Sequence, residues 1–141
     1  MADKRLWHAI DNLVKWQKET PNPDKRCLEA VRYALKKAGV KLPMSTVDYY
    51  GSFAIDCGKT LAAKPERWGW KLLGTTAKAL PTDGQPCLVF FRGVGWIPRR
   101  MKWAGHIAIY KPSTNRHISN ASYGMSLYWK LKIAFVFELM P

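Results

Sequence analysis

The sequence predicts an α+β fold in which N-terminal helices pack on a C-terminal antiparallel β-sheet. In the first third of the chain, apolar residues such as Leu6, Ile10 and Leu13 recur at helical spacing. After residue 68, short β-branched and aromatic runs alternate with Gly, Pro and Asp turn signals, as strands do. Helices followed by strands along one chain favour α+β over an alternating α/β architecture.

The helical part is expected to contain two well-defined helices, at residues 4–18 and 25–38. Asp24 is a suitable N-cap for the second helix, and Gly39 is a suitable stop. Residues 44–64 have a mixed apolar pattern that predicts one or two short helices.

The sheet is expected to begin with a strand at 70–73. The Asp83-Gly84-Gln85-Pro86 turn signal then leads into an apolar run that predicts a buried strand, and a loop rich in Gly, Trp and Arg follows. The buried strand is expected at 87–91, the loop at 92–103, and further strands at 105–111, 116–121, 126–131 and 133–139. The last two strands are so close together that they could form one bent strand.

Length and composition predict one globular domain that spans residues 1–141. Hydrophobic residues make up 48% of the chain and charged residues 23%, which excludes a disordered protein. The basic N-terminus is not followed by an apolar segment of signal-peptide length, and no run reaches transmembrane length. We therefore expect synthesis in the cytoplasm, with release or delivery by another factor if the protein acts outside.

The charge is strongly positive. Lys and Arg total 23 and Asp and Glu total 10, which gives a formal net charge of +13. Such a charge favours a polyanionic partner, namely nucleic acid, anionic lipid or an acidic cell-wall polymer. The simpler alternative is a general solubility charge.

Cys27 is the first candidate for chemistry. We expect it about three residues inside its helix, where free backbone N–H groups, the helix dipole and the neighbouring Lys25 and Arg26 favour a thiolate. The alternative is a small buried apolar residue. Of the other two cysteines, Cys87 is expected in the core and Cys57 could be exposed. Three cysteines without a Cys-x-x-Cys pair argue against a disulfide framework and against a structural zinc site.

His106 is the second candidate, in the run Gly105-His106-Ile107-Ala108-Ile109-Tyr110. On a strand its side chain shares a face with Ala108 and Tyr110, and Gly105 permits a close backbone approach. The imidazole could then meet the start of a helix, or it could be a hydrogen-bonded, partly buried histidine. His8 is expected on an amphipathic helix and His117 on the surface after a turn.

Asn120 is the candidate for the group that orients the His106 ring. It should lie on the neighbouring antiparallel strand near the level of His106, and its amide oxygen can accept an imidazole N–H. Ser119 or Ser122 could take this role instead, and Asn120 could also be an ordinary polar strand residue.

Four segments together resemble known enzymes. The order "RCLEAVRYALKKAG", "DGQPCLVFF", "GHIAIY" and "ISNAS" is similar to the CHAP and NlpC families of papain-like cell-wall amidases and peptidases. The resemblance covers roughly residues 24–122. The chain departs from the family pattern at Arg26, where a small or polar residue is usual, and at Gln85-Pro86-Cys87, which replaces a Gly-Asp pair. No upstream Tyr or Gln for an oxyanion hole is evident, although the Cys27 backbone N–H is a natural donor.

The resemblance implies a cysteine peptidoglycan hydrolase, an amidase or endopeptidase with a papain-like fold. Cys27 would be the nucleophile, His106 the acid and base, and Asn120 the third group, with no metal or organic cofactor. The resemblance also suggests a monomeric phage endolysin, or alternatively an amidase effector injected into another bacterium. Trp103, Arg99 and Arg100 are expected to contact peptidoglycan, anionic envelope polymers or lipid.

Three other functions compete with this interpretation. Seven Trp, six Tyr and the positive charge would suit a nucleic-acid-binding module, but no helix-turn-helix, zinc-finger or RNA-recognition motif is present. A lysozyme-like glycosidase needs two positioned carboxylates, and Glu19, Glu29 and Glu66 lack such a setting. A related Cys–His fold acting on another amide or ester is not separable by sequence.

Overall fold

The computed structural model describes residues 3–43, 53–97 and 102–141. Within these ranges, four α-helices pack with a six-stranded antiparallel sheet, which confirms the α+β prediction. The helices are α1 (Arg5–Glu19), α2 (Cys27–Lys37), α3 (Ala54–Ala63) and α4 (Leu127–Leu131). The sheet strands are β1 (Trp70–Gly74), β2 (Cys87–Phe91), β5 (His106–Lys111), β6 (Arg116–Ile118), β7 (Ser122–Gly124) and β8 (Ile133–Leu139). A separate two-stranded hairpin pairs β3 (Trp96–Ile97) with β4 (Lys102–Trp103).

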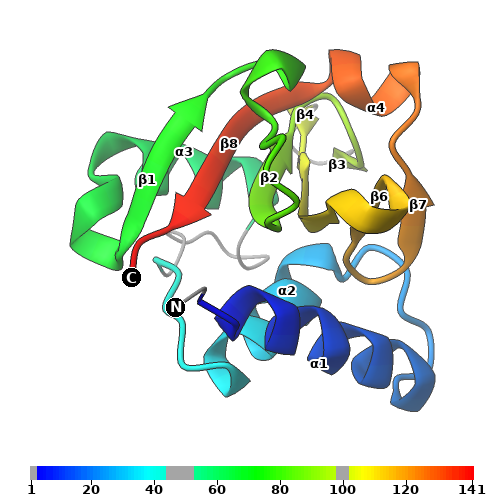
Figure 1. Cartoon of the computed structure of the whole chain (residues 1–141). Coiled ribbons are helices and arrows are strands. Elements are labelled where there is room, and N and C mark those ends of the chain that lie inside the picture. Colours follow the sequence, from blue (N-terminus) through cyan, green and yellow to red (C-terminus); the bar gives the residue numbers. More distant parts are fainter. Residues whose placement is uncertain (1–2, 44–52, 98–101) are drawn as a thin grey trace.

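The sheet has the strand order β1-β8-β2-β5-β6-β7, so the C-terminal strand lies inside it (Figure 1). The two ends of the chain lie close together, because the Arg5 Nη2 donates to the Met140 carbonyl oxygen at 2.8 Å. A short 3-10 helix at Pro65–Trp68 connects α3 to β1, and two more, at Ala77–Ala79 and Pro112–Thr114, lie between strands. No helix of the described ranges is long and apolar enough to cross a membrane.

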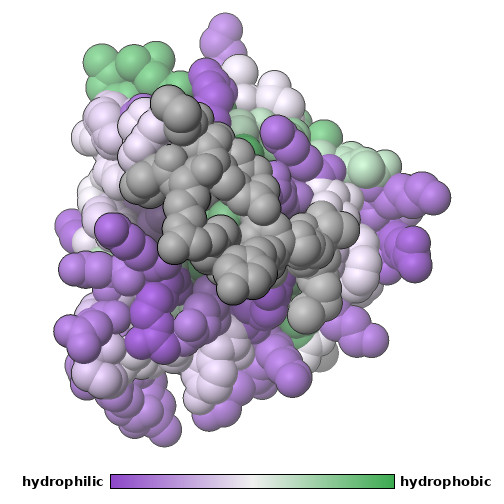
Figure 2. Space-filling view, turned by 180° about the vertical axis from the view of Figure 1, so that it is seen from behind, coloured by the Kyte–Doolittle hydropathy of each residue, from purple (hydrophilic) through white to green (hydrophobic). Residues whose placement is uncertain are grey.

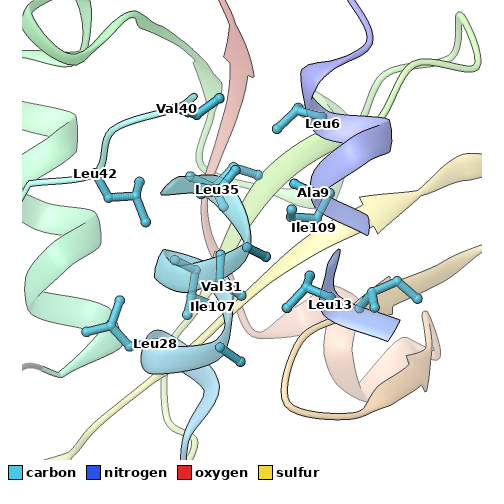
Figure 3. Packing of buried hydrophobic residues seen from close by; sticks show 14 of the residues in the cluster. Leu6, Ala9, Leu13, Leu28, Val31, Leu35, Val40, Leu42, Ile107 and Ile109 are labelled. Carbon is cyan, nitrogen blue, oxygen red and sulfur yellow. The ribbon is translucent and has the colours of Figure 1, made fainter. Parts of the chain in front are cut away.

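One side of the sheet is covered by helices. Leu28, Val31 and Leu35 of α2 pack on Ile107 and Ile109 of β5 (Figure 3). α1 adds its own apolar stripe to the same cluster, with Leu6, Ala9, Ile10 and Leu13. The predicted helical spacing therefore buries the faces that the sequence indicated.

The other side of the sheet is covered by shorter segments. Its cluster contains Val89 and Phe91 of β2, Ala108 and Tyr110 of β5, and Val136 of β8. Partly buried side chains from the connections pack against it, namely Leu73, Ala77, Ala79, Leu80, Val94 and Trp129. The alternation of strand side chains thus divides the core into two clusters on opposite sides of the sheet.

Most predicted elements are present, but several predictions are wrong. The predicted loop at 92–103 contains the strands β3 and β4, and the predicted strand at 116–121 ends at Ile118. Asp24 is not the N-cap of α2, because Arg26 occupies that position. Residues 126–131 were expected as a strand, but they form α4, in which Leu127 and Leu131 lie one turn apart and Trp129 turns toward the core. α2 begins at Cys27 rather than near residue 25, because Lys25 has a left-handed φ of 62° that a continuous helix excludes. The expectations for residues 44–52 and 98–101 lie outside the described residues.

Candidate active site

Cys27 occupies the first position of α2. The sequence placed it at about the third position of this helix, and the preceding Arg26 stands at the N-cap position without a side-chain cap. The thiol is free and half-buried. Burial raises its pKa, while hydrogen bonds from the backbone N–H groups of Ile107, Leu28 and Cys27 itself lower it. The expected bias toward a thiolate is thus outweighed by desolvation.

The packing of α2 on β5 fixes the position of Cys27 relative to the sheet. Leu28, the next residue of α2, lies in one apolar cluster with Ile107, the residue after His106 on β5. Cys27 and His106 both line the pocket at the start of this strand.

Gly105 permits α3 to approach the start of β5 closely. Its φ is +77°, and a Cβ there would lie 2.7 Å from the Ile55 Cβ and 2.8 Å from the Phe91 carbonyl oxygen. The Ile55 N–H donates to the Ala104 carbonyl at 2.9 Å, so the start of α3 is held directly against this turn. The expectation of a close backbone approach at Gly105 is confirmed.

His106 is 5% exposed and lies in a cluster of aromatic rings. Ring centroids of Phe91, His117, Tyr123 and Trp129 lie 5.6, 5.4, 5.4 and 5.1 Å from the His106 centroid. These rings are on the side of the sheet away from α2. Burial lowers the His106 pKa to about 4, so the ring is neutral at neutral pH.

The His106 ring has one unused polar atom. Its Nε2 is buried and has no hydrogen-bond partner among the described residues. An unpaired buried nitrogen costs free energy, and native proteins tolerate it mainly where the atom has a task. Such an atom can receive or give a proton once a substrate or water enters.

Asn120 follows the end of β6, and its hydrogen bonds join separate parts of the chain. Its Nδ2 donates to the Pro23 carbonyl at 3.1 Å, and its Oδ1 accepts from the Ser119 hydroxyl at 3.3 Å. These contacts tie the segment before Cys27 to the segment after β6. The role of Asn120 toward the His106 ring therefore stays a prediction, whereas its contact with Pro23 supports the position of α2.

Cys27, His106 and Asn120 line one pocket of about 360 Å³. The pocket takes residues from both sides of the sheet at the start of β5. Its other lining residues are Lys25, Leu28, Phe53, Ala54, Val94, Gly95, Trp96, Ala104, Gly105, Tyr123 and Trp129. The sequence prediction that these three residues belong together is thus consistent with their placement.

His117 was expected on the surface, and this prediction is wrong. β6 pairs with β5 so that His117 stands opposite Tyr110, which turns its side chain to the same side of the sheet as His106. The ring is fully buried, and neither nitrogen has a partner within the described parts of the chain. Burial, His106 and Arg116 lower its pKa to about 3. The sequence signal for the burial of His117 was the expected antiparallel pairing of β5 and β6 across the Lys111–Asn115 turn.

Tyr123 is a second residue that sequence reasoning missed. It lines the pocket, and its ring stacks on His117 at 5.1 Å with an interplanar angle of 18°. Burial raises the pKa of the Tyr123 phenol most. Electrostatic repulsion from Cys27 in its thiolate form and from Asp24 also raises this pKa, while a hydrogen bond with Asn120 lowers it. Its position on β7 has no sequence signal beyond a single Tyr in a short polar run.

The other predicted residues have different settings. The sequence left exposure of Cys57 open, and the structure shows it fully buried, with its Sγ donating to the Pro43 carbonyl at 3.7 Å. Burial raises the pKa of Cys57 to about 11 and also raises that of Cys87, which is in the core as predicted. His8 lies exposed on α1, as expected.

Of the three expected substrate contacts, Trp103 lies beside the pocket. Trp103 is 50% exposed on β4, and its ring lies 5.1 Å from that of Trp96, which does line the pocket. Trp103 itself lines a neighbouring hollow of about 740 Å³. Arg99 and Arg100 lie outside the described residues. Among the residues that are described, no three His, Cys, Asp or Glu side chains are grouped to hold a metal ion.

Comparison of the chain with protein-family models, curated proteins and solved structures finds no match in any of the three. The functional argument therefore depends on the geometry of the pocket and on the residues that form it.

Proposed function

We propose that the chain is a cysteine hydrolase of papain-like fold that cleaves an amide bond of peptidoglycan. The observation that carries this proposal is the shared pocket, which Cys27 at the start of α2 and His106 at the start of β5 both line. A nucleophile and a base that line one pocket are the minimum requirement for acyl transfer. The resemblance of four segments to cell-wall amidases and peptidases supplies the substrate class.

The pKa directions define the resting state of the proposed pair. Burial raises the Cys27 pKa and lowers that of His106, so thiol and imidazole are both neutral at neutral pH. His106 would accept the thiol proton as the Cys27 sulfur attacks the amide carbonyl carbon. The carbonyl oxygen then carries the negative charge, and we expect the Cys27 backbone N–H to donate to it at that stage.

The remaining steps return the proton and release both products. His106 gives its proton to the leaving amine as the carbon–nitrogen bond breaks, which leaves a thioester on Cys27. Water then gives a proton to His106 and attacks the thioester carbonyl. Collapse of that intermediate breaks the carbon–sulfur bond, and the sulfur recovers the proton from His106. One amide and one water thus become one amine and one carboxylic acid.

The charge supports a substrate embedded in an anionic envelope. A formal charge of +13 attracts the protein to acidic wall polymers, and the attraction weakens as salt shortens the Debye length to about 8 Å or less. A phage endolysin that another factor releases to the wall, or an amidase effector injected by another bacterium, would both use such a charge. We favour the endolysin.

Digestion of purified peptidoglycan tests the proposal. We expect new amino ends and no new reducing sugar ends, identified by mass spectrometry of the released fragments. Cys27→Ser should abolish their release, and Cys87→Ala, which alters a buried cysteine away from the pocket, should not. New reducing ends would indicate a glycosidase. Tight binding of nucleic acid without any wall cleavage would favour the nucleic-acid-binding module.

A further inference from the structure

A group of large apolar side chains lies exposed at one end of the molecule. Leu127, Tyr128 and Leu131 of α4 are 69%, 56% and 65% exposed, and Trp96 and Trp103 of the β3–β4 hairpin are 46% and 50% exposed. We call these five residues the apolar patch. In Figure 2 hydrophobic side chains project at the upper left, over the end where Figure 1 shows α4.

The patch is continuous. On a helix Leu127, Tyr128 and Leu131 share one face, while Trp129 points the other way into the cluster around His106. Tyr128 and Leu131 line the same 740 Å³ hollow as Trp103. The Trp96 and Trp103 rings then contact each other at 5.1 Å. Apolar groups of this size, gathered on one surface, are typical of an interaction site rather than of scattered exposure.

Basic side chains surround the patch. Lys59, Arg92 and Lys132 line the hollow together with one acidic residue, Asp56. Lys130 lies exposed on α4 itself, and residues 122–137 contain no Asp or Glu. The Lys132 ammonium stands 4.8 Å over the Tyr128 ring and 3.4 Å from the Gly93 carbonyl, which holds positive charge at the apolar border.

We infer that the apolar patch inserts into the surface of an anionic lipid bilayer. Leu side chains that project from a short helix, Trp and Tyr rings beside them and a basic rim are the combination that binds the headgroup boundary. The rim charges complement anionic headgroups, each by an amount that falls off within a Debye length. A protein partner would need acidic side chains placed opposite these basic residues.

The inference does not depend on the proposed hydrolase activity, but it has a consequence for it. Trp96 belongs to the patch and also lines the pocket of Cys27 and His106. Binding at the bilayer would therefore hold the candidate active site beside the membrane surface, within reach of wall material that lies next to it.

Co-sedimentation with lipid vesicles tests the inference. The full chain should bind vesicles of equal parts phosphatidylglycerol and phosphatidylcholine, and should bind vesicles of phosphatidylcholine alone much more weakly. The double variant Leu127→Ser/Leu131→Ser should lose roughly tenfold or more in partitioning to the anionic vesicles, because it removes two apolar side chains that would insert into the bilayer. Lys130→Gln/Lys132→Gln should lose about fivefold per charge.

Val14→Ser/Tyr33→Ser is the matched control, since both residues are exposed apolar side chains on α1 and α2. It should bind vesicles like the parent, and thermal unfolding should be the same for all variants. Absence of binding to anionic vesicles, or equal loss in the control, would overturn the inference. A parent dimer in sedimentation that Leu127→Ser/Leu131→Ser dissociates would also overturn it, because the patch would then be covered by a second copy.

Discussion

Neighbouring residues of β5 have different surroundings on the two sides of the sheet. On the helix side, Ile107 and Ile109 are fully buried against α2 and contribute aliphatic side chains to the larger apolar core. On the other side, His106 and His117 are buried with ring nitrogens that have no partner in the described structure. Adjacent residues of one strand thus divide into apolar packing on one side and, in our proposal, acid–base chemistry on the other. The His106 and His117 rings lie next to each other, with centroids 5.4 Å apart.

The largest expected effect is on catalysis. His106→Ala should reduce the rate of amide cleavage by about 10² to 10⁴, because the acid and base steps are both lost. His8→Ala, which removes an exposed histidine on α1, is the control and should leave the rate unchanged. The rate is measured as amines released from peptidoglycan. Full activity of a folded His106→Ala protein would remove the functional distinction between the two sides of the sheet.

A large effect on stability is expected from the opposite side. Ile109→Ala should lower the free energy of unfolding by about 2–5 kcal/mol, because it leaves a cavity in the aliphatic core. The folded fraction should cleave at the parent rate, since Ile109 does not line the pocket. Urea denaturation measures the first quantity and the initial rate below the transition measures the second. A small stability loss together with a large rate loss would contradict this division.

Acid should weaken the histidine side selectively. Burial lowers the pKa of His106 from 6.5 to about 4 and that of His117 to about 3, so below the ordinary value the unfolded chain binds more protons. The free energy of unfolding should therefore fall as pH decreases from about 6.5. The slope is at most about 1.4 kcal/mol per pH unit for each histidine. A flat urea midpoint between about pH 6.5 and pH 5 would show that these rings are not buried neutral.

The smallest effect is expected from His117→Phe. The substitution removes two unpaired nitrogens while it keeps a ring among Phe91, Tyr123 and Trp129. We expect the protein to gain roughly 1 kcal/mol at neutral pH and to lose part of its acid sensitivity. The rate should change by less than about tenfold if His117 acts on His106 through packing alone. A loss as severe as that of His106→Ala would give His117 a part in proton transfer.

The sequence was sufficient where periodicity and local turns decide the structure. The helical stripe of Leu6, Ile10 and Leu13, the buried strand after Pro86 and the close approach at Gly105 are all properties of short segments. They predicted α1, β2 and the start of β5. The sequence also grouped Cys27, His106 and Asn120, which line one pocket.

The predictions were wrong where strand pairing or desolvation determines the structure or the pKa of a residue. The burial of His117 depends on its pairing with Tyr110, and α4 depends on Trp129 packing into the core, so neither is visible in a local pattern. The start of α2 moved because of the backbone at Lys25. The Cys27 pKa was misjudged because the helix start was weighed without the desolvation that packing on β5 imposes.

The central claim is that the Cys27 thiol is the nucleophile, and alkylation of the native protein tests it most directly. Cys57 and Cys87 are fully buried, whereas Cys27 is half-buried at the pocket. Iodoacetamide should add one carbamidomethyl group, on Cys27, with a rate that continues to rise above the ordinary thiol pKa. Loss of peptidoglycan cleavage should follow the same time course. Complete labelling of Cys27 with cleavage retained would contradict the account.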